Sequence, residues 1–363
     1  MTSTVDNKSE VVQSGTTISI DAMGGDLGPA AVVAGIVRVV QKNKKIHFLL
    51  HGQQKQLQEL VAKRQSLKGR VTIIDSLEVI KMEDKPSHVV RHGKATSMWS
   101  AIDSVRDGDA SVCVSCGNTG ALMAISMVRL RKLNGVNRPA IAILWPSSNP
   151  MGFNVMLDVG ADVRADPKDL LQYALMGVSY ARNGLGIAKP RVGLLNVGTE
   201  EHKGRSELKE AYAKIEHCQL DANFVFEGFV EGGDIPGSKV DVIITDGFTG
   251  NVALKTAEGT ASLIGYLLRE AFRFSPLSKL ASILAFTSLN RFKMRIDPRR
   301  VNGGVFLGLN GTVVKSHGSA DATGIEAAIK LAFELSKNDF LQKVAARVAY
   351  AGAIDNDVYD DAN

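Results

Sequence analysis

The stretch Asp246-Gly-Phe-Thr-Gly-Asn-Val-Ala-Leu-Lys255 decides the fold, because it joins a predicted strand to a predicted helix. The apolar, β-branched run 240–245 before it is typical of a buried strand, and a helical pattern runs from Val252 to about Phe272. A glycine-rich turn that opens a helix gathers backbone N–H groups at the positive end of the helix dipole, where an anion can bind. An ordinary tight connection would have the same composition, so this stretch alone leaves both interpretations open.

Three other strand-like runs end in turns of the same kind. Polar turns that contain glycine, at residues 22–26, 117–120 and 198–204, follow the runs 18–21, 111–116 and 192–197. In open α/β sheets, ligands bind outside the carboxyl ends of the strands. We therefore predict that the four turns line one crevice and that a ligand binds there.

The alternation of strands and helices predicts an α/β fold with a mostly parallel sheet that helices cover on both faces. The runs 138–145 and 153–159 are separated by a short turn, which indicates an antiparallel hairpin and hence a mixed sheet. Asp166 before Pro167 is a plausible N-cap of the next helix. The segment 80–96 is charged and has little periodicity, and we expect a loop there.

Composition narrows the class of protein. The chain has 363 residues, of which 45% are hydrophobic and 22% charged, as in soluble globular proteins. Aromatic residues make up only 6%, which argues against a nucleic-acid binder that stacks bases. Three cysteines are too few for a disulfide framework. Cys113 and Cys116 should point to opposite faces of their strand, so we expect packing rather than a redox or metal role. We expect no metal and no cofactor.

The ends of the chain are polar. Residues 1–16 include no apolar stretch after a basic start, so we predict a disordered tail and no secretory signal. Residues 351–363 are acidic and are predicted to fray. A single domain is expected over residues 17–350. No run of about eighteen apolar residues occurs, so no transmembrane helix is expected.

The segment 263–300 combines large apolar residues with basic ones. Between Arg269 and Arg300 it carries eight basic and two acidic residues. Its net charge of +6 exceeds the net charge of the whole chain, which is +5. A basic, amphipathic helical hairpin fits contact with an anionic membrane surface, and a buried dimer interface is the alternative. We favour the membrane because a buried interface would not need so many cations. Leu280, Ile283 and Leu284 are the expected contact residues.

Six ordered motifs between about residues 18 and 349 resemble the acyl-ACP:phosphate acyltransferase family, PlsX. They are Asp21-Ala-Met-Gly-Gly-Asp26, Gly117-Asn-Thr-Gly-Ala-Leu-Met123, Leu157-Asp-Val-Gly-Ala-Asp162, Asn196-Val-Gly-Thr-Glu-Glu201 through Lys203-Gly204, Thr245-Asp-Gly-Phe-Thr-Gly-Asn251 and Lys315-Ser-His-Gly-Ser319. The resemblance implies a Rossmann-like three-layer α/β/α sandwich akin to isopropylmalate dehydrogenase and phosphotransacetylase.

The resemblance also implies a bacterial, cytoplasmic homodimer that associates peripherally with the membrane. It implies transfer of a long acyl chain from acyl carrier protein to inorganic phosphate. A membrane glycerol-3-phosphate acyltransferase would then use the acyl phosphate in phosphatidic acid synthesis. The family's catalytic lysine and asparagine correspond to Lys203 and Asn251.

The expected chemistry assigns further residues. Phosphate must be held near the thioester carbonyl, and donors must meet the developing oxyanion. We expect substrate and phosphate to contact Asp21, Gly24, Gly25, Asp26, Gly117, Asn118, Thr119, Thr249, Gly250 and His317. We expect Arg91 and Lys94 to face the carrier protein.

Four alternatives remain. The first is a phosphotransacetylase that uses acyl-CoA. The second is a covalent acyl-Cys116 route, and the third is a membrane adaptor without enzyme activity. An NAD-dependent dehydrogenase is disfavoured, because no clean Gly-x-Gly-x-x-Gly follows a strand.

Overall fold

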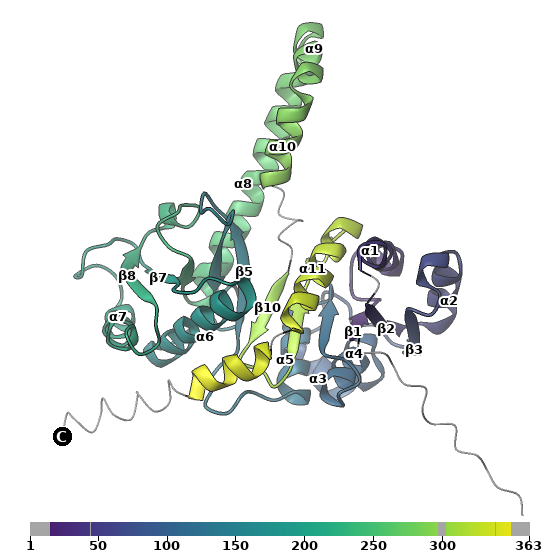
Figure 1. Cartoon of the computed structure of the whole chain (residues 1–363), viewed down its shortest axis with the longest axis horizontal. Coiled ribbons are helices and arrows are strands. Elements are labelled where there is room, and N and C mark those ends of the chain that lie inside the picture. The colour runs from purple at the N-terminus through teal and green to yellow at the C-terminus, as the bar shows by residue number, and fades with distance from the viewer. Residues whose placement is uncertain (1–14, 44, 297–302, 338, 350–363) are drawn as a thin grey trace, which may run out of the picture.

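The computed structural model describes residues 15–43, 45–296, 303–337 and 339–349. Its strands are β1 (Thr16–Asp21), β2 (Ile46–Gly52), β3 (Val71–Asp75), β4 (Val112–Ser115), β5 (Ala140–Pro146), β6 (Phe153–Leu157), β7 (Arg191–Leu195), β8 (Val225–Val230), β9 (Val242–Ile244), β10 (Gly304–Leu307) and β11 (Thr312–Lys315). Its α-helices are α1 (Gly28–Lys42), α2 (Gln54–Ala62), α3 (Pro86–His92), α4 (Ser97–Arg106), α5 (Thr119–Arg129), α6 (Pro167–Leu185), α7 (Ser206–Cys218), α8 (Gly247–Arg273), α9 (Pro276–Leu284), α10 (Phe286–Ile296) and α11 (Ala322–Leu335). Figure 1 shows the arrangement.

The described strands form one sheet of eleven, in the order β3-β2-β1-β4-β11-β10-β5-β6-β9-β7-β8. Helices cover both of its faces. Core residues of α1, α2, α6, α7 and α11 join one hydrophobic cluster, and those of α3, α4, α5 and α8 join the other or pack against it. The predicted three-layer, Rossmann-like α/β/α sandwich with a mostly parallel, mixed sheet is confirmed.

Burial on both faces explains why the strands read as continuous apolar runs. In β4, Val112 and Val114 belong to the first cluster and Cys113 to the second. Cys116 belongs to the first cluster, so the two cysteines lie on opposite sides of the sheet, as predicted.

Two blocks of parallel strands run in opposite directions. β3, β2, β1, β4 and β11 are parallel to one another, as are β6, β9, β7 and β8. Between the blocks, the pairs β11–β10, β10–β5 and β5–β6 are antiparallel, and the last of these is the predicted hairpin. Three reversals mean that the two blocks point in opposite directions, but their stagger brings the carboxyl ends to neighbouring rows, because Ser115 and Lys315 align through Gly304 and Ile143 with Met156 and Ile243.

The prediction that four turns line one crevice is confirmed for only two of them, because one cavity is lined by Thr119 and Gly120 after β4 and by Asn251 after β9, but by no residue of 22–26 or 198–204. The turns after β1 and β4 meet each other, because Ser115 Oγ donates to Asp21 Oδ2 at 2.7 Å. The turns after β7 and β9 meet separately, through an ion pair between Arg205 and Asp246. The sequence predicted the β5–β6 hairpin but not the antiparallel pairing of β10 with β5.

Two local predictions also need correction. The predicted loop 80–96 contains α3, which begins at Pro86 and buries Val89 against the second cluster. The helix was missed because it is short and most of its residues are polar or charged, with Val89 as its buried apolar contact. The helix predicted from Val252 starts earlier, at Gly247, with Asp246 as its N-cap. The Asp166 cap is confirmed, as a capping box with Asp169.

The predicted polar tail at 1–16 lies outside the described residues up to residue 14, and Thr16 already begins β1. The predicted acidic tail at 351–363 lies wholly outside them, as do Arg299 and Arg300 of the basic hairpin. In the described part of the chain, no helix is both long enough and apolar enough to span a bilayer.

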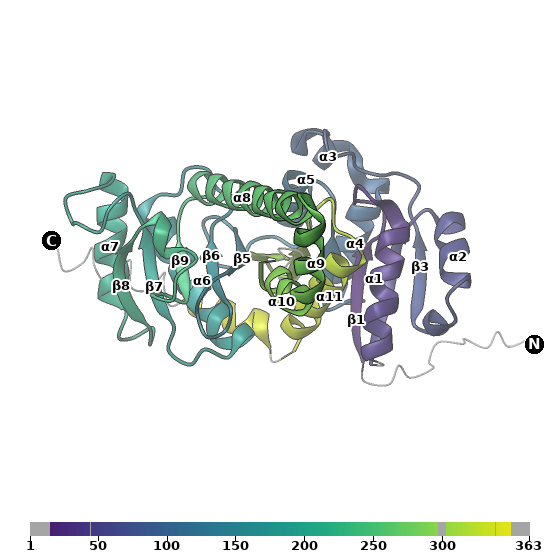
Figure 2. The same cartoon turned by 90° about the horizontal axis from the view of Figure 1, so that it is seen from above.

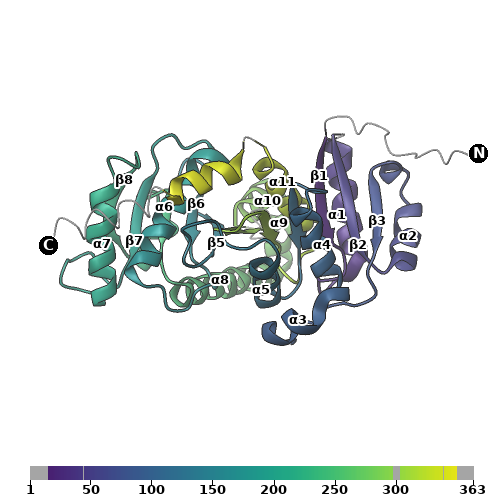
Figure 3. The same cartoon turned by 90° about the horizontal axis from the view of Figure 1, so that it is seen from below.

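Helix α8 begins on one face of the sheet and extends beyond the body of the molecule. Figures 2 and 3 show α5 and α8 on the same face of the sheet, near β5. The far half of α8 leaves the body together with α9 and α10, and Figure 1 shows this projection. The α9 triplet, Leu280, Ile283 and Leu284, is exposed on it by 53%, 70% and 81%. The predicted helical hairpin is thus present up to residue 296.

Candidate functional site

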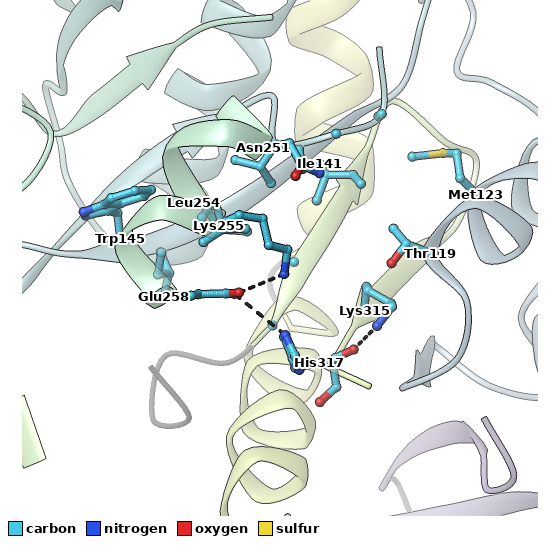
Figure 4. A pocket seen from close by; sticks show the side chains of 18 of the residues that line it. Thr119, Met123, Ile141, Trp145, Asn251, Leu254, Lys255, Glu258, Lys315 and His317 are labelled. Atoms are coloured by element: carbon cyan, nitrogen blue, oxygen red, sulfur yellow. Dashed lines mark hydrogen bonds and ion pairs between the residues drawn. The ribbon is translucent and has the colours of Figure 1, made fainter. Parts of the chain in front are cut away.

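A cavity of about 570 Å³ lies between β5, α5 and α8, beside the end of β11. Its walls are mostly apolar. The larger apolar residues lining it are Ile141, Ile143, Leu144 and Trp145 of β5, Met123 and Met127 of α5, and Leu254 of α8. The size and the apolar lining are those of a ligand pocket for a molecule with a hydrocarbon part. Figure 4 shows the cavity and its polar residues.

Polar side chains gather at one end of this cavity (Figure 4). Lys255 and Glu258 project from α8, one helical turn apart, and Lys255 Nζ lies 2.8 Å from Glu258 Oε2. His317 follows β11, and its Nε2 lies 3.8 Å from Glu258 Oε1. These two neighbours lower the pKa of Glu258 to about 2, so the carboxylate is ionised.

Lys315, the last residue of β11, is the most deeply buried cation of this group. Its Nζ donates to the backbone carbonyl of Ser316. Its pKa is lowered to about 8, first by burial and also by the charge of Lys255, against opposing effects of Cys116, Asp26 and Asp21. Two lysines at this end therefore repel each other, and Glu258 is the acidic residue that lines the cavity with them.

The sequence at the start of α8 explains why this helix can lie so close to the sheet. Gly250 is buried, and a Cβ there would overlap the carbonyl oxygen of Asp158. Gly247 donates its N–H to the carbonyl of Asp162 at 2.7 Å, and a Cβ there would also clash. The two glycines let α8 pack against the loop after β6, which sets the position of every cavity residue on the helix.

Asn251 projects into the cavity from the second turn of α8 (Figure 4). Its Nδ2 lies 3.5 Å from the carbonyl oxygen of Val159, a long contact that leaves the amide able to donate to a ligand. Gly160 packs directly against it with φ +124°, a conformation that favours glycine. The predicted residue Asn251 is thus in the cavity, as are Thr119 and His317.

Other predicted contact residues hold the fold together instead of lining the cavity. Asp21 is buried and accepts hydrogen bonds from Ser97 Oγ and Ser115 Oγ, both at 2.7 Å. Burial raises its pKa. A Cβ at Gly24 would lie 2.5 Å from Asp21 Oδ2 and 2.8 Å from Gly117, so these glycines allow the turns after β1 and β4 to touch.

Gly25, Asp26 and Asn118 also have structural partners. Gly25 packs against Cys116, and the backbone N–H of Asp26 donates to the carbonyl of Gly318 at 2.8 Å. The Asn118 side chain caps α5 by accepting from Ala121 N–H at 3.0 Å. Its Nδ2 donates to the carbonyls of Met82 and Asp84, at 2.8 and 3.0 Å. The amide of Asn118 therefore ties the 81–84 loop to α5.

The backbone of Thr249 and Gly250 is already engaged. Thr249 N–H donates to Asp246 Oδ1 at 2.7 Å, and Gly250 N–H donates to the Asp246 carbonyl at 2.9 Å. The glycine-rich stretch is the capped first turn of α8 and not an open anion cradle. Its contribution to the site is the placement of Asn251 and Lys255.

Lys203 and the expected carrier-protein contacts lie on the surface. Lys203 is in the loop after β7, forms an ion pair with Glu200 at 2.7 Å and does not line the cavity. Arg91 on α3 and Lys94 in the following turn are exposed. The structure thus brings Asn251, Thr119 and His317 together and leaves Lys203 apart from them.

Sequence reasoning missed Lys255, Glu258 and Lys315 as site residues. Lys255 closes the stretch that decides the fold, and Lys315 opens the motif that contains His317. The available signal was the helical period, because positions 251, 254, 255 and 258 share one face of a helix. The apolar lining from β5 gave no signal, because core strands have the same composition.

Cysteine and metal chemistry gain no support. Burial raises the pKa of Cys116 to about 11, which disfavours the thiolate needed for an acyl-Cys116 route. Among the described residues, no three His, Cys, Asp or Glu side chains group closely enough to hold a metal ion.

Comparison with known proteins adds the family context. Residues 16–343 match the sequence profile of a family described as fatty acid synthesis protein. The phosphate acyltransferase of Ruegeria sp. strain TM1040 is 70% identical over 336 residues, which cover 93% of this chain and 90% of the relative. That of Ruegeria pomeroyi is 67% identical over 340 residues, covering 94% and 92%.

Solved structures agree at the level of the fold. A phosphotransacetylase from Streptococcus pyogenes superposes with a TM-score of 0.58 and 17% identity, over 89% of this chain and 94% of that one. The EutD phosphotransacetylase from Staphylococcus aureus gives 0.55 and 14%, with the same coverage. Identities this low support the shared α/β architecture alone.

Proposed function

Because the chain belongs to the fatty acid synthesis protein family, whose curated relatives are phosphate acyltransferases, we propose that it makes acyl phosphate from long-chain acyl carrier protein and inorganic phosphate. The chain is an acyltransferase. The proposed product is consumed by a membrane glycerol-3-phosphate acyltransferase and so feeds phosphatidic acid and phospholipid synthesis.

The observation that carries this proposal is a single cavity with apolar walls and a cationic end. A long acyl chain gains about 0.8 kcal/mol for each CH₂ that leaves water, so the wall of β5, α5 and α8 suits it. An anionic nucleophile suits the end at which Lys255 and Lys315 lie. Both reactants can thus occupy adjoining parts of one space, which is the main requirement for a bimolecular transfer.

In the proposed reaction, an oxygen of HPO₄²⁻ attacks the thioester carbonyl carbon. A C–O bond forms, the C–S bond breaks, and the proton of the phosphate ends on the thiol of the carrier. Asn251 offers an amide N–H₂ to the developing oxyanion without a change of charge. Lys203 remains a predicted catalytic residue, and its exposed position requires the carrier or a second subunit to complete a site around it.

The test is incubation of the protein with palmitoyl carrier protein and labelled inorganic phosphate. Acyl phosphate should form, and added hydroxylamine should convert it to a hydroxamate that can be measured. Palmitoyl-CoA in place of the carrier substrate should give a much lower kcat/KM. Absence of acyl phosphate would refute the proposal, and a preference for the CoA thioester would favour the phosphotransacetylase-like alternative. Sulfate in place of phosphate is the control for the nucleophile.

The proposal includes a cytoplasmic enzyme held peripherally at an anionic membrane by the projecting α8–α10 helices. The exposed α9 triplet supplies an apolar contact, and Lys279, next to Leu280 in the sequence, supplies a cationic one. Arg91 and Lys94 are the proposed contacts for acyl carrier protein. A homodimer is part of the same proposal, and the exposed apolar residues Leu263 and Leu267 of α8 suit its interface.

A further inference from the structure

The cationic end of the cavity brings three nitrogen-bearing side chains to one place. Lys255 comes from α8, whereas Lys315 and His317 come from the end of β11 and the turn that follows (Figure 4). These elements are separated by sixty residues of sequence, and only the packing of α8 over the sheet brings them together. The arrangement is fixed by the glycine contacts at the start of α8 and by the pairing of β11 with β4 and β10.

The charges at this end are not balanced. Glu258 pairs with Lys255 at 2.8 Å and is the acidic residue of the lining, so it offsets one lysine. Lys315 has backbone carbonyls as its nearest hydrogen-bond partners, those of Ser316 and Cys116. Asp26 and Asp21 attract Lys315 but do not form an ion pair with it, so a partly buried cation here is costly, and an anion that enters the cavity would relieve that cost. The repulsion between Lys255 and Lys315 acts in the same direction.

We propose that Lys315 and Lys255 bind the oxygens of inorganic phosphate at this end of the cavity, with His317 as a third donor. This inference rests on the proposed acyl transfer and assigns its nucleophile site to two lysines that sequence reasoning did not single out, beside the expected His317. Glu258 holds Lys255 and His317 at the rim. The apolar wall then directs the acyl chain away from the anion, which leaves the thioester carbonyl between the phosphate and Asn251.

A different phosphate could bind the same cations. It is the phosphate that links acyl carrier protein to the prosthetic arm on which the acyl group is carried. The whole arm separates that phosphate from the thioester. Lys315 lines the same cavity as the apolar wall, so a phosphate bound there lies near the reacting carbon and not at the far end of an arm. The geometry therefore favours the nucleophile, and kinetics can distinguish the two sources.

The experiment measures KM for phosphate and KM for palmitoyl carrier protein in wild type, Lys315→Met and Lys255→Met. Methionine keeps most of the length and removes the charge. Loss of a charge-assisted hydrogen bond should raise KM for phosphate about ten- to a hundredfold for Lys315→Met, with KM for the carrier changed less than twofold. Lys330→Met is the matched control, because Lys330 also pairs with a glutamate, Glu326, but lies on α11 outside the cavity.

A second measurement needs no turnover. Phosphate should raise the melting temperature of wild type and of Lys330→Met, and should have little effect on Lys315→Met with a wild-type circular dichroism spectrum. Unchanged phosphate KM in folded Lys315→Met would overturn the inference. A raised KM for the carrier alone would overturn it too and assign the cations to the prosthetic arm. A wild-type protein that makes no acyl phosphate would instead refute the proposed function, while the melting experiment would still report on the anion site.

Discussion

Replacing Gly250 by alanine tests whether the close approach of α8 to the β6 loop builds the site. A Cβ at this position would come well within the 3.0 Å below which real Cβ atoms essentially never approach another atom, and the atom it meets is the backbone oxygen of Asp158. Backbone cannot rotate away as a side chain can, so α8 or the loop must move. Gly259, farther along the same helix, is exposed and has nothing within 4 Å of its Cβ direction.

The two substitutions should therefore act in opposite directions. Forced overpacking costs about 1–3 kcal/mol. Movement of α8 also strains the hydrogen bond from Gly247 N–H to Asp162, worth about 1 kcal/mol. Gly250→Ala should thus lose roughly 2–4 kcal/mol of unfolding free energy by these contributions. Gly259→Ala should gain about 0.5–1 kcal/mol, because alanine is the better helix former.

Urea unfolding followed by circular dichroism measures both values, and acyl phosphate synthesis on the same samples measures the site. Residual folded Gly250→Ala should show reduced kcat, because Asn251, Leu254 and Lys255 all move with the helix. Equal stability of the two variants, together with wild-type turnover of Gly250→Ala, would refute the reasoning. Lost activity with unchanged stability would mean that the loop yields and only the cavity is disturbed, so the predicted stability cost would be wrong.

Four further outcomes are expected. Lys203→Ala should lower turnover about a hundredfold, the usual cost of one oxyanion donor, without affecting folding, and wild-type turnover in the folded variant would remove Lys203 from the mechanism. Asn251→Asp should be less active than Asn251→Ala, because a carboxylate repels phosphate, and the reverse order would show that no anion approaches this residue. Polar replacement of the α9 triplet should release the protein from anionic vesicles and spare soluble turnover, whereas an inactive monomer on gel filtration would favour the dimer interface. Lys315→Met should be more stable than wild type below pH 8, by at most about 3 kcal/mol, because the folded protein there keeps a buried ammonium whose pKa is about 8. That advantage should shrink as pH rises from about 8 towards the ordinary pKa of lysine, since the unfolded chain then binds more protons than the folded one, and urea unfolding across this range measures it.

The sequence by itself determined the class of fold and most of its elements. Alternating short apolar runs and helical patterns identify strands buried between two helical layers, because burial on both faces removes the polar alternation. Local signals with a fixed geometry were equally informative. Asp166 before Pro167 marked a helix start, and the closely spaced β5 and β6 runs marked an antiparallel hairpin. The six motifs identified the family, which the matching relatives confirm.

Only the tertiary structure decided which of these residues meet. The order of strands in the sheet is a long-range property, and it brings two of the four turns, those after β4 and β9, to one cavity and leaves the other two outside it. The sequence suggested that Asp21 and Asn118 bind a ligand. In the structure Asp21 accepts hydrogen bonds from Ser97 and Ser115, and Asn118 donates to loop carbonyls. Lys315, an ordinary strand-end lysine in the sequence, becomes a partly buried cation that lines one cavity with Lys255 of α8. Burial and neighbouring charge set the chemistry of such a group, and neither is encoded within a few residues of it.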